Sequence, residues 1–358
     1  MTFTRVSAKS LLVDPSPLTV PNERYVTGFV ESSGRLTPRI GTRLGIADIA
    51  GAWRVRLGIG RGRYRVRPGL YAVGAPTPAS AVLVTANYKL SFDELRKRLS
   101  GIDAWIVVLD TKGVNVWCAA GKGSFGTKEL VERLAKLSLK EVVAHRIIVL
   151  PQLAAPGVSA VEVATASGFR VVYGPVRAAD LPAFLESGMK KDAAMRTVRF
   201  GLADRAVLGP LELVHAWPLA GAALALALLS ALPFSGGFGS RLSAISSVLI
   251  GSVVLGSLGF PILLPALPFR SFALKGAALG TVWGLAGSIL AAARPLGGVS
   301  LVLASSAIVS YLGLNFTGSS TYTCQTGTAR EVKLGIPAMI TAAALSVLAG
   351  GISAFSRY

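Results

Sequence analysis

The stretch Asn115-Val116-Trp117-Cys118-Ala119-Ala120-Gly121-Lys122 stands between an apolar run, Trp105–Leu109, and a predicted helix at about Thr127–Leu137. The apolar run is typical of a buried strand, and a glycine-rich turn follows Lys122. A thiol at a strand-to-helix junction lies near free backbone N–H groups, and here a lysine is also close; both favour the thiolate. We therefore expect Cys118 to act as a soft-metal ligand or a nucleophile, with Trp117 closing one side of a pocket.

On either side of this stretch, apolar runs alternate with amphipathic segments. The pattern predicts strands at Val82–Thr85, Trp105–Leu109, Val142–Leu150 and Arg170–Tyr173, and helices at Ser91–Leu99, Lys128–Leu137, Val158–Ser167 and Ala179–Glu186. Such alternation predicts an α/β, Rossmann-like domain with a parallel sheet covered on both faces. Before Ser80 we expect further β structure, with Pro68-Gly69-Leu70-Tyr71 as a turn.

Ligands of parallel sheets sit at the carboxyl ends of the strands. Three segments should therefore converge on one edge: Thr85-Ala86-Asn87-Tyr88, the Asn115–Lys122 stretch, and Pro151-Gln152-Leu153.

The second half of the chain is much more apolar. The predicted spans are Leu211–Leu232, Leu242–Leu264, Ser271–Ala293, Leu296–Leu314 and Leu334–Ala354. Each is about as long as a membrane-spanning helix of roughly 20 residues. The short break at Arg294-Pro295 leaves open that the third and fourth form one re-entrant hairpin. We expect a soluble domain at 1–205 and an all-α transmembrane domain of about five helices at 206–358.

Flanking cations suggest the orientation. With the first domain in the cytosol, seven Arg or Lys residues flank the spans on the inner side and three on the outer side, which favours this arrangement. Met1 to Ser10 is polar and no apolar core follows, so no secretory signal is expected. Two cysteines without a pairing pattern fit a reducing compartment. We predict a multi-pass protein of the cytoplasmic (inner) membrane.

The net charge of +19 raises the possibility of nucleic-acid binding. Arg54-Val55-Arg56 and the segment from Arg61 to Arg67 alternate like a strand with one charged face. No nucleic-acid motif or aromatic platform accompanies them, so no nucleic-acid partner is expected. A solvated face, attraction of juxtamembrane cations to anionic lipid, and contact with an acidic partner or cofactor tail remain open.

Several familiar motifs nearly match. Gly121-Lys122-Gly123-Ser124-Phe125-Gly126 fits G-x-G-x-x-G after a strand, but the acidic residue about 20 positions on, Glu141, precedes the next strand. No Walker A loop is present, and two cysteines cannot supply four thiolates for a zinc or iron–sulfur site. The cobalamin motif D-x-H-x-x-G is missing around His145, which is interpreted as a residue at a strand border.

The chain resembles the HgcA family, the corrinoid proteins of the mercury-methylating pair. The stretch NVWCAAGK at 115–122 carries the resemblance most specifically. Further segments are Pro68–Gly74, Asn87–Asp93, Tyr173–Ala178 and Asn315–Gly318. The soluble part is similar to the corrinoid domain of the large subunit of the corrinoid iron–sulfur protein, without the cysteine-rich cluster domain of that subunit.

The resemblance implies an anaerobic corrinoid-dependent methyltransferase. A corrinoid (cobalamin or a relative) would bind base-off in its methylcob(III)alamin form, with the Cys118 thiolate as lower ligand of cobalt and 115–122 as a helical cap. The methyl group would come from a methyl-folate donor and pass to Hg(II), giving methylmercury. The implied partner is HgcB, a ferredoxin with two 4Fe–4S clusters that reduces the cobalt.

Candidate cofactor contacts follow from this arrangement. Asn115 would hydrogen-bond the sulfur and Lys122 would offset its charge. Asn87 and Ser91 are candidates on the other face of the ring, and Thr85 and Gln152 are further candidates at the same edge of the sheet.

Alternatives remain. The acceptor could belong to one-carbon or acetyl-CoA metabolism, or the chain could be a dinucleotide-binding membrane regulator or transport accessory. Without the resemblance, Cys118 and Trp117 are core residues. Cys324 is interpreted as a spectator, or as a relay for a soft metal. The spans are interpreted as an anchor because no charge lies at mid-span.

Overall fold

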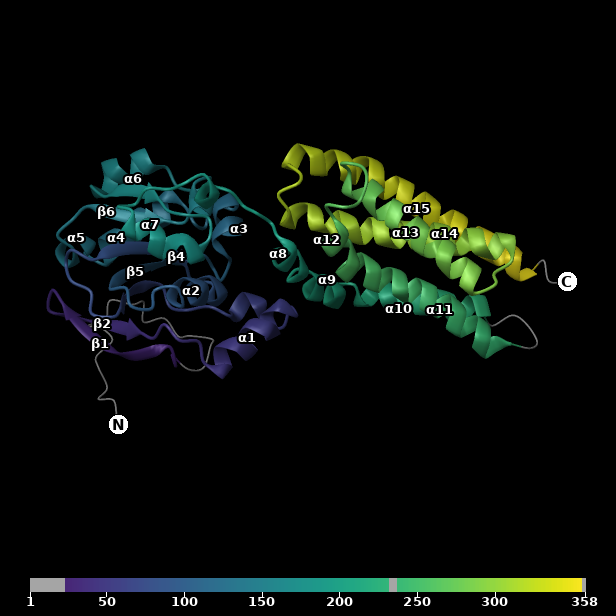
Figure 1. Ribbon diagram of the computed structural model, residues 1–358, viewed down its shortest axis with the longest axis horizontal. Coiled ribbons are helices and arrows are strands. Elements are labelled where there is room, and N and C mark those ends of the chain that lie inside the picture. Colours follow the sequence, from purple (N-terminus) through teal and green to yellow (C-terminus); the bar gives the residue numbers. More distant parts are fainter. Residues whose placement is uncertain (1–22, 232–236, 356–358) are drawn as a thin grey trace. The chain divides into compact units, whose positions relative to one another are not determined.

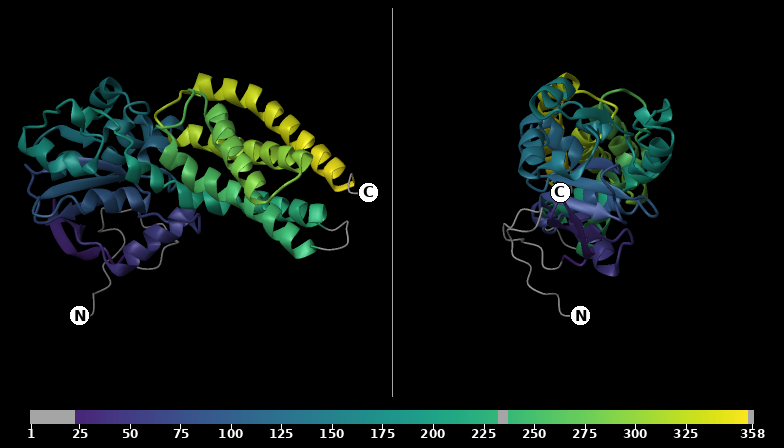
Figure 2. Two further views of the ribbon diagram at one scale, coloured as in Figure 1. Left: turned by 45° about the vertical axis from the view of Figure 1, so that its right-hand side comes forward. Right: turned by 90° about the vertical axis from the view of Figure 1, so that its left-hand side faces the viewer.

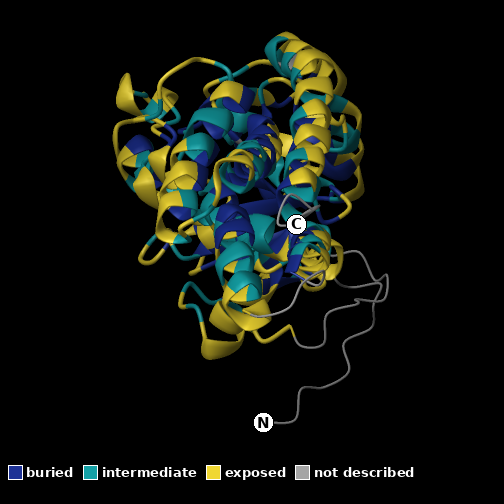
Figure 3. Cartoon of the chain, turned by 90° about the vertical axis from the view of Figure 1, so that its right-hand side faces the viewer, coloured by how far each residue is buried: buried dark blue, intermediate teal, exposed yellow. Residues whose placement is uncertain are grey.

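A computed structural model describes residues 23–231 and 237–355, and the expectation for Met1–Ser10 lies outside them. The chain forms two compact units. The first reaches Val198 and the second begins at Arg199, with Arg56–Gly58 grouped with the second. Each unit has its own buried apolar clusters. Figure 3 shows buried segments inside the fold and exposed segments on the outside.

The first unit is built on a mixed seven-stranded sheet with the order β1-β2-β3-β5-β4-β6-β7. Figure 1 shows the β1–β2 hairpin, in purple, at one end of this sheet. The strands are β1 (Val26–Ser32), β2 (Arg35–Ile40), β3 (Gly69–Val73), β4 (Ala81–Ala86), β5 (Ala104–Leu109), β6 (Ile147–Leu150) and β7 (Arg170–Tyr173).

The four C-terminal strands of the sheet are parallel, because β4 pairs in parallel with both β5 and β6, and β6 pairs in parallel with β7. The predicted α/β class is therefore confirmed. The four strands predicted between Val82 and Tyr173 form the parallel part of the sheet. The further β structure expected before Ser80 makes the sheet mixed, because β3 runs antiparallel to β5 and β1 antiparallel to β2. The N-terminal strands thus extend a doubly wound core without a helical crossover at every step.

Helices cover both faces of the sheet. They are α1 (Ile46–Arg56), α2 (Lys89–Arg96), α3 (Val116–Gly121), α4 (Thr127–Lys136), α5 (Leu139–Val142), α6 (Ala160–Ser167) and α7 (Leu181–Glu186). Four short 3-10 turns join them: η2 (Arg61–Arg63), η3 (Gln152–Ala154), η4 (Ala178–Asp180) and η5 (Ala194–Arg196).

Alternate residues of β5 show how the two faces are filled. Trp105 and Val107 point into a cluster shared with α3 to α6, whereas Ile106 and Val108 point into a second cluster shared with α2 and α7. This is the two-residue period of a strand buried on both sides. Consequently α2 and α3 lie on opposite faces of the sheet.

Three local predictions in this unit were wrong. Gly69–Val73 is the buried strand β3 and not a turn, because its apolar run is fully covered. The predicted strand Val142–Leu150 is shortened to β6, since Leu139 and Val142 are buried on the one-turn helix α5. Arg54-Val55-Arg56 lies in helix α1, and η2 follows it; three alternating residues are too few to separate a strand from a helix.

The second unit is helical. Its helices are α8 (Leu202–Ala206), α9 (Gly209–His215), α10 (Trp217–Ala231), α11 (Phe238–Val254), α12 (Phe260–Leu263), α13 (Phe272–Leu290), α14 (Pro295–Asn315) and α15 (Gln325–Phe355). A π-helical turn, η6 (Leu255–Gly259), joins α11 to α12, and the 3-10 turn η7 (Phe316–Ser319) follows α14.

Within the described residues, four helical segments are long and apolar enough to cross a membrane: Phe238–Leu263, Phe272–Leu290, Pro295–Gly318 and Thr326–Ala354. The two segments around Arg294 are separate long helices. The predicted first span Leu211–Leu232 is not one straight helix, because Leu202–His215 and Trp217–Ala231 meet at 57°. Pro218 explains the bend, since proline disfavours helical geometry at the residue before it. If this bent pair crosses as one span, the number becomes five.

Close approach of α13 to α14 organises this unit, and the two helices lie side by side in both figures (Figures 1 and 2). Gly276, Gly280 and Gly284 recur every four residues along α13. A methyl group added at any of them would meet the backbone of α14 at 2.4–2.7 Å. Glycines at this spacing let two helix backbones pack without side chains between them, as membrane helices commonly do.

Candidate functional site

The carboxyl ends of β4, β5 and β6 lie at one edge of the sheet, because the three strands are parallel and β4 pairs with both of the others. The chain leaves β4 toward β5 on one side and later returns to β6 on the other. This reversal is the switch point at which open α/β sheets bind ligands. The segments predicted to converge here are brought to this edge, and α3 contacts both β4 and η3.

Helix α3 presents two different faces. Ala119 and Ala120 are buried in the core, whereas Cys118, Gly121 and Lys122 are exposed and Trp117 is 41 % exposed. Val116 and Asn115 are half-buried. The interpretation of Cys118 and Trp117 as core residues is therefore wrong, and the thiol lies on a surface that a ligand can reach.

Asn115 begins this helix. Its side-chain oxygen Oδ1 accepts a hydrogen bond from the backbone N–H of Cys118 at 2.8 Å, the usual contact of an N-terminal cap. The Asn115 side chain therefore binds the backbone that carries the thiol through its oxygen. The expected hydrogen bond from Asn115 to the sulfur stays a prediction.

Asn87 holds the loop that leads to α3. Its side-chain Oδ1 accepts three hydrogen bonds, from Thr111 N at 3.1 Å, Thr111 Oγ1 at 2.8 Å and Gly113 N at 2.9 Å. Its Nδ2 donates to Asp110 Oδ1 at 3.0 Å. The side chain is almost fully buried, so Asn87 positions the loop after β5. Sequence reasoning placed this residue at this edge, and its contact with a cofactor stays a prediction.

Asp110 is the first residue of the same loop. Burial by itself raises the pKa of its carboxyl, but hydrogen bonds from the side chain and backbone of Lys112, together with nearby positive charge, bring the pKa below its usual value. Its backbone N–H donates to Glu129 Oε1 at 2.8 Å, and Arg133 holds that carboxylate. The loop before Cys118 is therefore fixed from both β4 and α4.

The glycines around α3, three in the glycine-rich turn and Gly157 after η3, occupy either tight or open positions. A methyl group added at Gly157 would meet Phe125 O at 2.4 Å and Ala120 Cα at 2.8 Å, and one at Gly126 would meet Gly123 O at 2.7 Å. By contrast, no atom lies within 4 Å of the corresponding position at Gly121 or Gly123. The turn also follows helix α3 and not a strand, which departs from the arrangement of a dinucleotide fingerprint.

The remaining candidates are more scattered. Thr85 is buried within β4, and Gln152 Oε1 accepts a hydrogen bond from Lys191 Nζ. Burial, followed by the charge of Arg196, lowers the pKa of Lys191. Ser91 is half-buried in the first turn of α2, on the opposite face of the sheet from α3. His145 binds backbone groups of Ser80 and Ile147, as expected of a residue at a strand border.

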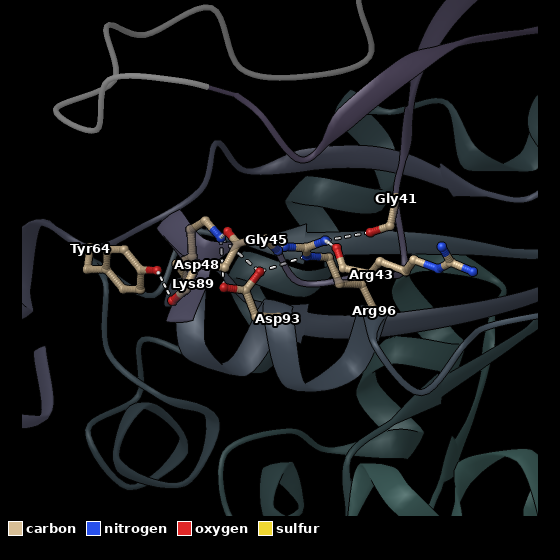
Figure 4. A network of polar contacts seen from close by, with 8 residues as sticks. All are labelled: Gly41, Arg43, Gly45, Asp48, Tyr64, Lys89, Asp93 and Arg96. Carbon is tan, nitrogen blue, oxygen red and sulfur yellow. Dashed lines mark hydrogen bonds and ion pairs between the residues drawn. The ribbon is translucent and has the colours of Figure 1, made fainter. Parts of the chain in front are cut away.

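A buried network of charges beside this edge was missed (Figure 4). Lys89 Nζ lies 2.6 Å from Asp48 and 2.7 Å from Asp93, and Arg96 lies 2.8 Å and 2.7 Å from the same two carboxylates. Arg96 also donates to the backbone oxygens of Gly41 and Arg43. The spacing of Lys89, Asp93 and Arg96 on one helix was visible in the sequence, but the pairing with Asp48 was not.

The network fixes helix α1 against helix α2. Burial raises the pKa of Asp48, but hydrogen bonds from Lys89 and Gly45 and the charges of Lys89 and Arg96 outweigh it and bring the pKa below its usual value. Tyr64 adds a hydrogen bond to the backbone oxygen of Asp48. Two cations and two carboxylates are thus compensated internally.

Within the described residues, no three His, Cys, Asp or Glu side chains are grouped so that they could hold a metal ion. The second cysteine, Cys324, is exposed in the other unit and its pKa is lowered by hydrogen bonds from Thr326 and Gly327.

Fold and site together define a doubly wound α/β domain with an exposed thiol at its switch-point edge. Residues 60–185 match the family described as CO dehydrogenase/acetyl-CoA synthase delta subunit. This match includes β3 to β7 and Cys118, and the helical unit lies outside it.

Curated relatives carry a related description. Gamma subunits of the acetyl-CoA decarbonylase/synthase complex are 37 % identical over 123 residues in Methanopyrus kandleri and 33 % identical over 124 residues in Archaeoglobus fulgidus. In both cases the alignment covers 34 % of this chain and 26 % of the relative. This chain thus spans about a quarter of the length of the relatives it matches.

Proposed function

We propose that this chain is a membrane-anchored corrinoid protein that carries a methyl group, with the Cys118 thiolate as the lower ligand of cobalt. The observation that carries the proposal is the exposed thiol on α3, at the switch-point edge of a domain similar to subunits of acetyl-CoA-forming complexes. A soft thiolate is a suitable ligand for such a metal centre.

The exposed face of α3 fits a flat, large cofactor. Cys118 and Lys122 project from it, and the open space at Gly121 and Gly123 lets a ring approach the backbone closely. The buried face of Ala119 and Ala120 fixes the helix to the sheet, so the thiol is held in a defined position. Trp117 would cover one edge of the ring.

When bound, a corrinoid supplies a cobalt ion to which a methyl group can be attached and from which it can leave. Cys118 would hold the cobalt, and its electron-rich thiolate would favour loss of a methyl group together with the bonding electrons. Lys122 would offset the thiolate charge, and the Asn115 cap keeps the backbone at Cys118 in place.

Two methyl acceptors are compatible with this chemistry. The similarity to gamma subunits of acetyl-CoA decarbonylase/synthase complexes favours an acceptor of one-carbon or acetyl-CoA metabolism. The stretch NVWCAAGK favours Hg(II), because it resembles the cap of the mercury-methylating family. The chemistry also fits Hg(II), because a soft, electron-poor ion accepts a methyl group together with its bonding electrons. The methyl carrier is common to both.

The remaining components of the system are part of the proposal. Two cysteines cannot bind a 4Fe–4S cluster, so a separate ferredoxin of the HgcB type would supply electrons. A methyl-folate, or the enzyme that handles it, would supply the methyl group. The four long apolar helices would anchor the carrier in the cytoplasmic membrane, with the α/β domain in the cytosol.

The test uses the full chain in detergent or nanodiscs, without oxygen, with added cobalamin. Wild type, Cys118→Ala and the matched control Cys324→Ala are compared by visible spectroscopy, and methylmercury is assayed after methylation and addition of Hg(II). A base-off spectrum that changes only in Cys118→Ala would support the methyl carrier. Methylmercury from wild type and Cys324→Ala but not Cys118→Ala would select Hg(II). A Cys118-dependent spectrum without methylmercury would select the one-carbon acceptor, and failure to bind corrinoid would reject both.

A further inference from the structure

Helix α1 carries an outward apolar face. Ile46 is 87 % exposed, Ile49 50 % and Trp53 56 %, and Leu57, just after the helix, is 37 % exposed. Positions separated by three, four and seven residues fall on one side of a helix with 3.6 residues per turn. A continuous exposed stripe of large apolar side chains marks an interaction surface.

The opposite side of α1 is attached to the domain. Val55 is fully buried, and Asp48 is held by Lys89 and Arg96. The helical period places Asp48 and Val55 about half a turn away from Ile46 and Trp53. The contacts of its inner side therefore fix the orientation of α1, and the apolar stripe faces away from the core of the domain.

The stripe is surrounded by positive charge. Residues 41–65 contain six arginines and one acidic residue, Asp48. Arg43, Arg54, Arg61 and Arg63 are exposed, while the Asp48 carboxylate is already bound by the two buried cations. The surface around the apolar stripe is thus strongly basic.

We infer that α1 lies in the interfacial layer of an anionic membrane, with Ile46, Ile49 and Trp53 inserted among the lipid headgroups and the nearby arginines on the phosphates. An apolar face with tryptophan, bordered by arginine, is the composition of helices that lie in this layer. The inference does not require a corrinoid. It rests on the proposed membrane crossing of the second unit, which places a bilayer on the same chain.

The surface would hold the α/β domain close to the membrane. Anionic lipid attracts clusters of arginine within a short distance, so the attachment should depend on lipid charge and on salt. A partner protein of acidic character is the competing occupant, and the experiment separates the two.

The full chain is reconstituted into nanodiscs of phosphatidylcholine alone or mixed with phosphatidylserine. Hydrogen exchange of residues 46–57 is expected to slow at least about tenfold in the anionic bilayer, and added salt should reverse part of this protection. Brominated lipid should quench the fluorescence that is lost on Trp53→Phe. The double variant Ile49→Ser/Trp53→Ser should lose the protection, whereas Val161→Ser, a matched change at a 76 % exposed residue of α6, should retain it.

Equal exchange in both bilayers, without quenching of Trp53, would overturn the inference. Equal exchange in both bilayers with quenching of Trp53 would show apolar insertion without recognition of anionic lipid, and would overturn the role of the arginines. Alkaline extraction of the same membranes distinguishes the two proposals: release of the whole chain would reject membrane crossing, whereas a retained chain without lipid-dependent protection would reject only the role of α1.

Discussion

The side-chain oxygen of Asn115 lies 2.8 Å from the backbone nitrogen of Cys118, so the residue that begins α3 also fixes the backbone that carries the exposed thiol. A six-residue helix has few internal hydrogen bonds, and its first turn depends on such a cap. The Asn115 cap therefore helps to hold the thiol in place, together with the buried Ala119 and Ala120 on the other face of the helix.

Replacing Asn115 tests this dependence. Asn115→Ala should cost about 1 kcal/mol of local stability, while Asn115→Ser keeps a capping oxygen and should cost less. If the corrinoid needs an ordered α3, its affinity should fall about fivefold in the alanine variant and recover in the serine variant. Hydrogen exchange of residues 118–121 and titration with cobalamin measure the two effects. Identical behaviour of alanine and serine would show that the cap is not what Asn115 contributes.

Substitutions at two glycines around α3 distinguish an effect on folding from an effect on cofactor binding. Gly157→Ala should push α3 from its place, because the new methyl group would lie 2.4 Å from Phe125 O and 2.8 Å from Ala120 Cα. We expect a loss of about 1–3 kcal/mol, measured by thermal unfolding.

Gly121→Ala should leave the fold unchanged, since nothing lies within 4 Å of the added methyl group. If the cofactor rests on this face, cobalamin affinity should nevertheless fall, because the methyl group would occupy the space of the ring. Unchanged affinity in a folded Gly121→Ala protein would place the cofactor elsewhere.

The sequence predictions were correct where local interactions determine the structure, and they failed where residues far apart in the sequence determine it. The apolar runs of β4, β5 and β7 identify strands by themselves, and the four-residue periodicity of α4 identifies a helix. The position of Cys118 at the sheet edge follows from the order of these elements. By contrast, Pro68-Gly69 predicts a turn, because this pair usually breaks regular structure, and only pairing with β5 makes Gly69–Val73 a strand.

The roles of polar side chains were harder to predict because their partners lie far along the chain. Asn87 binds a loop 24 to 26 residues away, and Lys89 binds Asp48 across 41 residues. Residues separated by so many positions produce no periodic pattern in the sequence, so neither contact could be predicted from it. The exposed face of α1 was obscured for the same reason, since its inner side is defined by a network that the fold assembles.

The charge network predicts how stability depends on pH. The pKa of Asp48 is lowered in the folded chain, so its contribution is complete above the unfolded value of about 3.9 and is lost as the pH falls through the folded value. We expect the free energy of unfolding to drop as the solution is acidified below about pH 4. Asp48→Asn should be less stable at neutral pH and should lose less on acidification.

Thermal unfolding across this pH range measures the effect, with Glu132→Gln as the control. Glu132 is an exposed carboxylate 4.0 Å from Lys128, and such surface pairs contribute little. Should wild type and Asp48→Asn lose stability in parallel on acidification, the network would not be the source of the acid sensitivity.

The glycine stripe of α13 predicts the response of the helical unit to a single methyl group. At Gly280 the added group would lie 2.4 Å from Ser305 O and 2.8 Å from Ser306 Cα of α14, so the two helix backbones would have to separate. Gly280→Ala should therefore lower stability by about 1–3 kcal/mol, even though alanine is the better helix former. Gly221→Ala, in α10, is the matched control, because nothing lies within 4 Å of its added group and it should be neutral or slightly stabilising.

Trp283 of α13 offers a local probe, since its indole N–H donates to the Val248 oxygen of α11 at 2.9 Å. The part of the fluorescence that is lost on Trp283→Phe should report an earlier thermal transition in detergent for Gly280→Ala than for Gly221→Ala. If both variants unfold together with wild type, α13 and α14 are not packed backbone to backbone, and the close contact along the stripe is wrong. Because the contact is between backbones, a larger residue such as valine at position 280 should be worse than alanine, and no compensating change of a side chain on α14 should restore it fully.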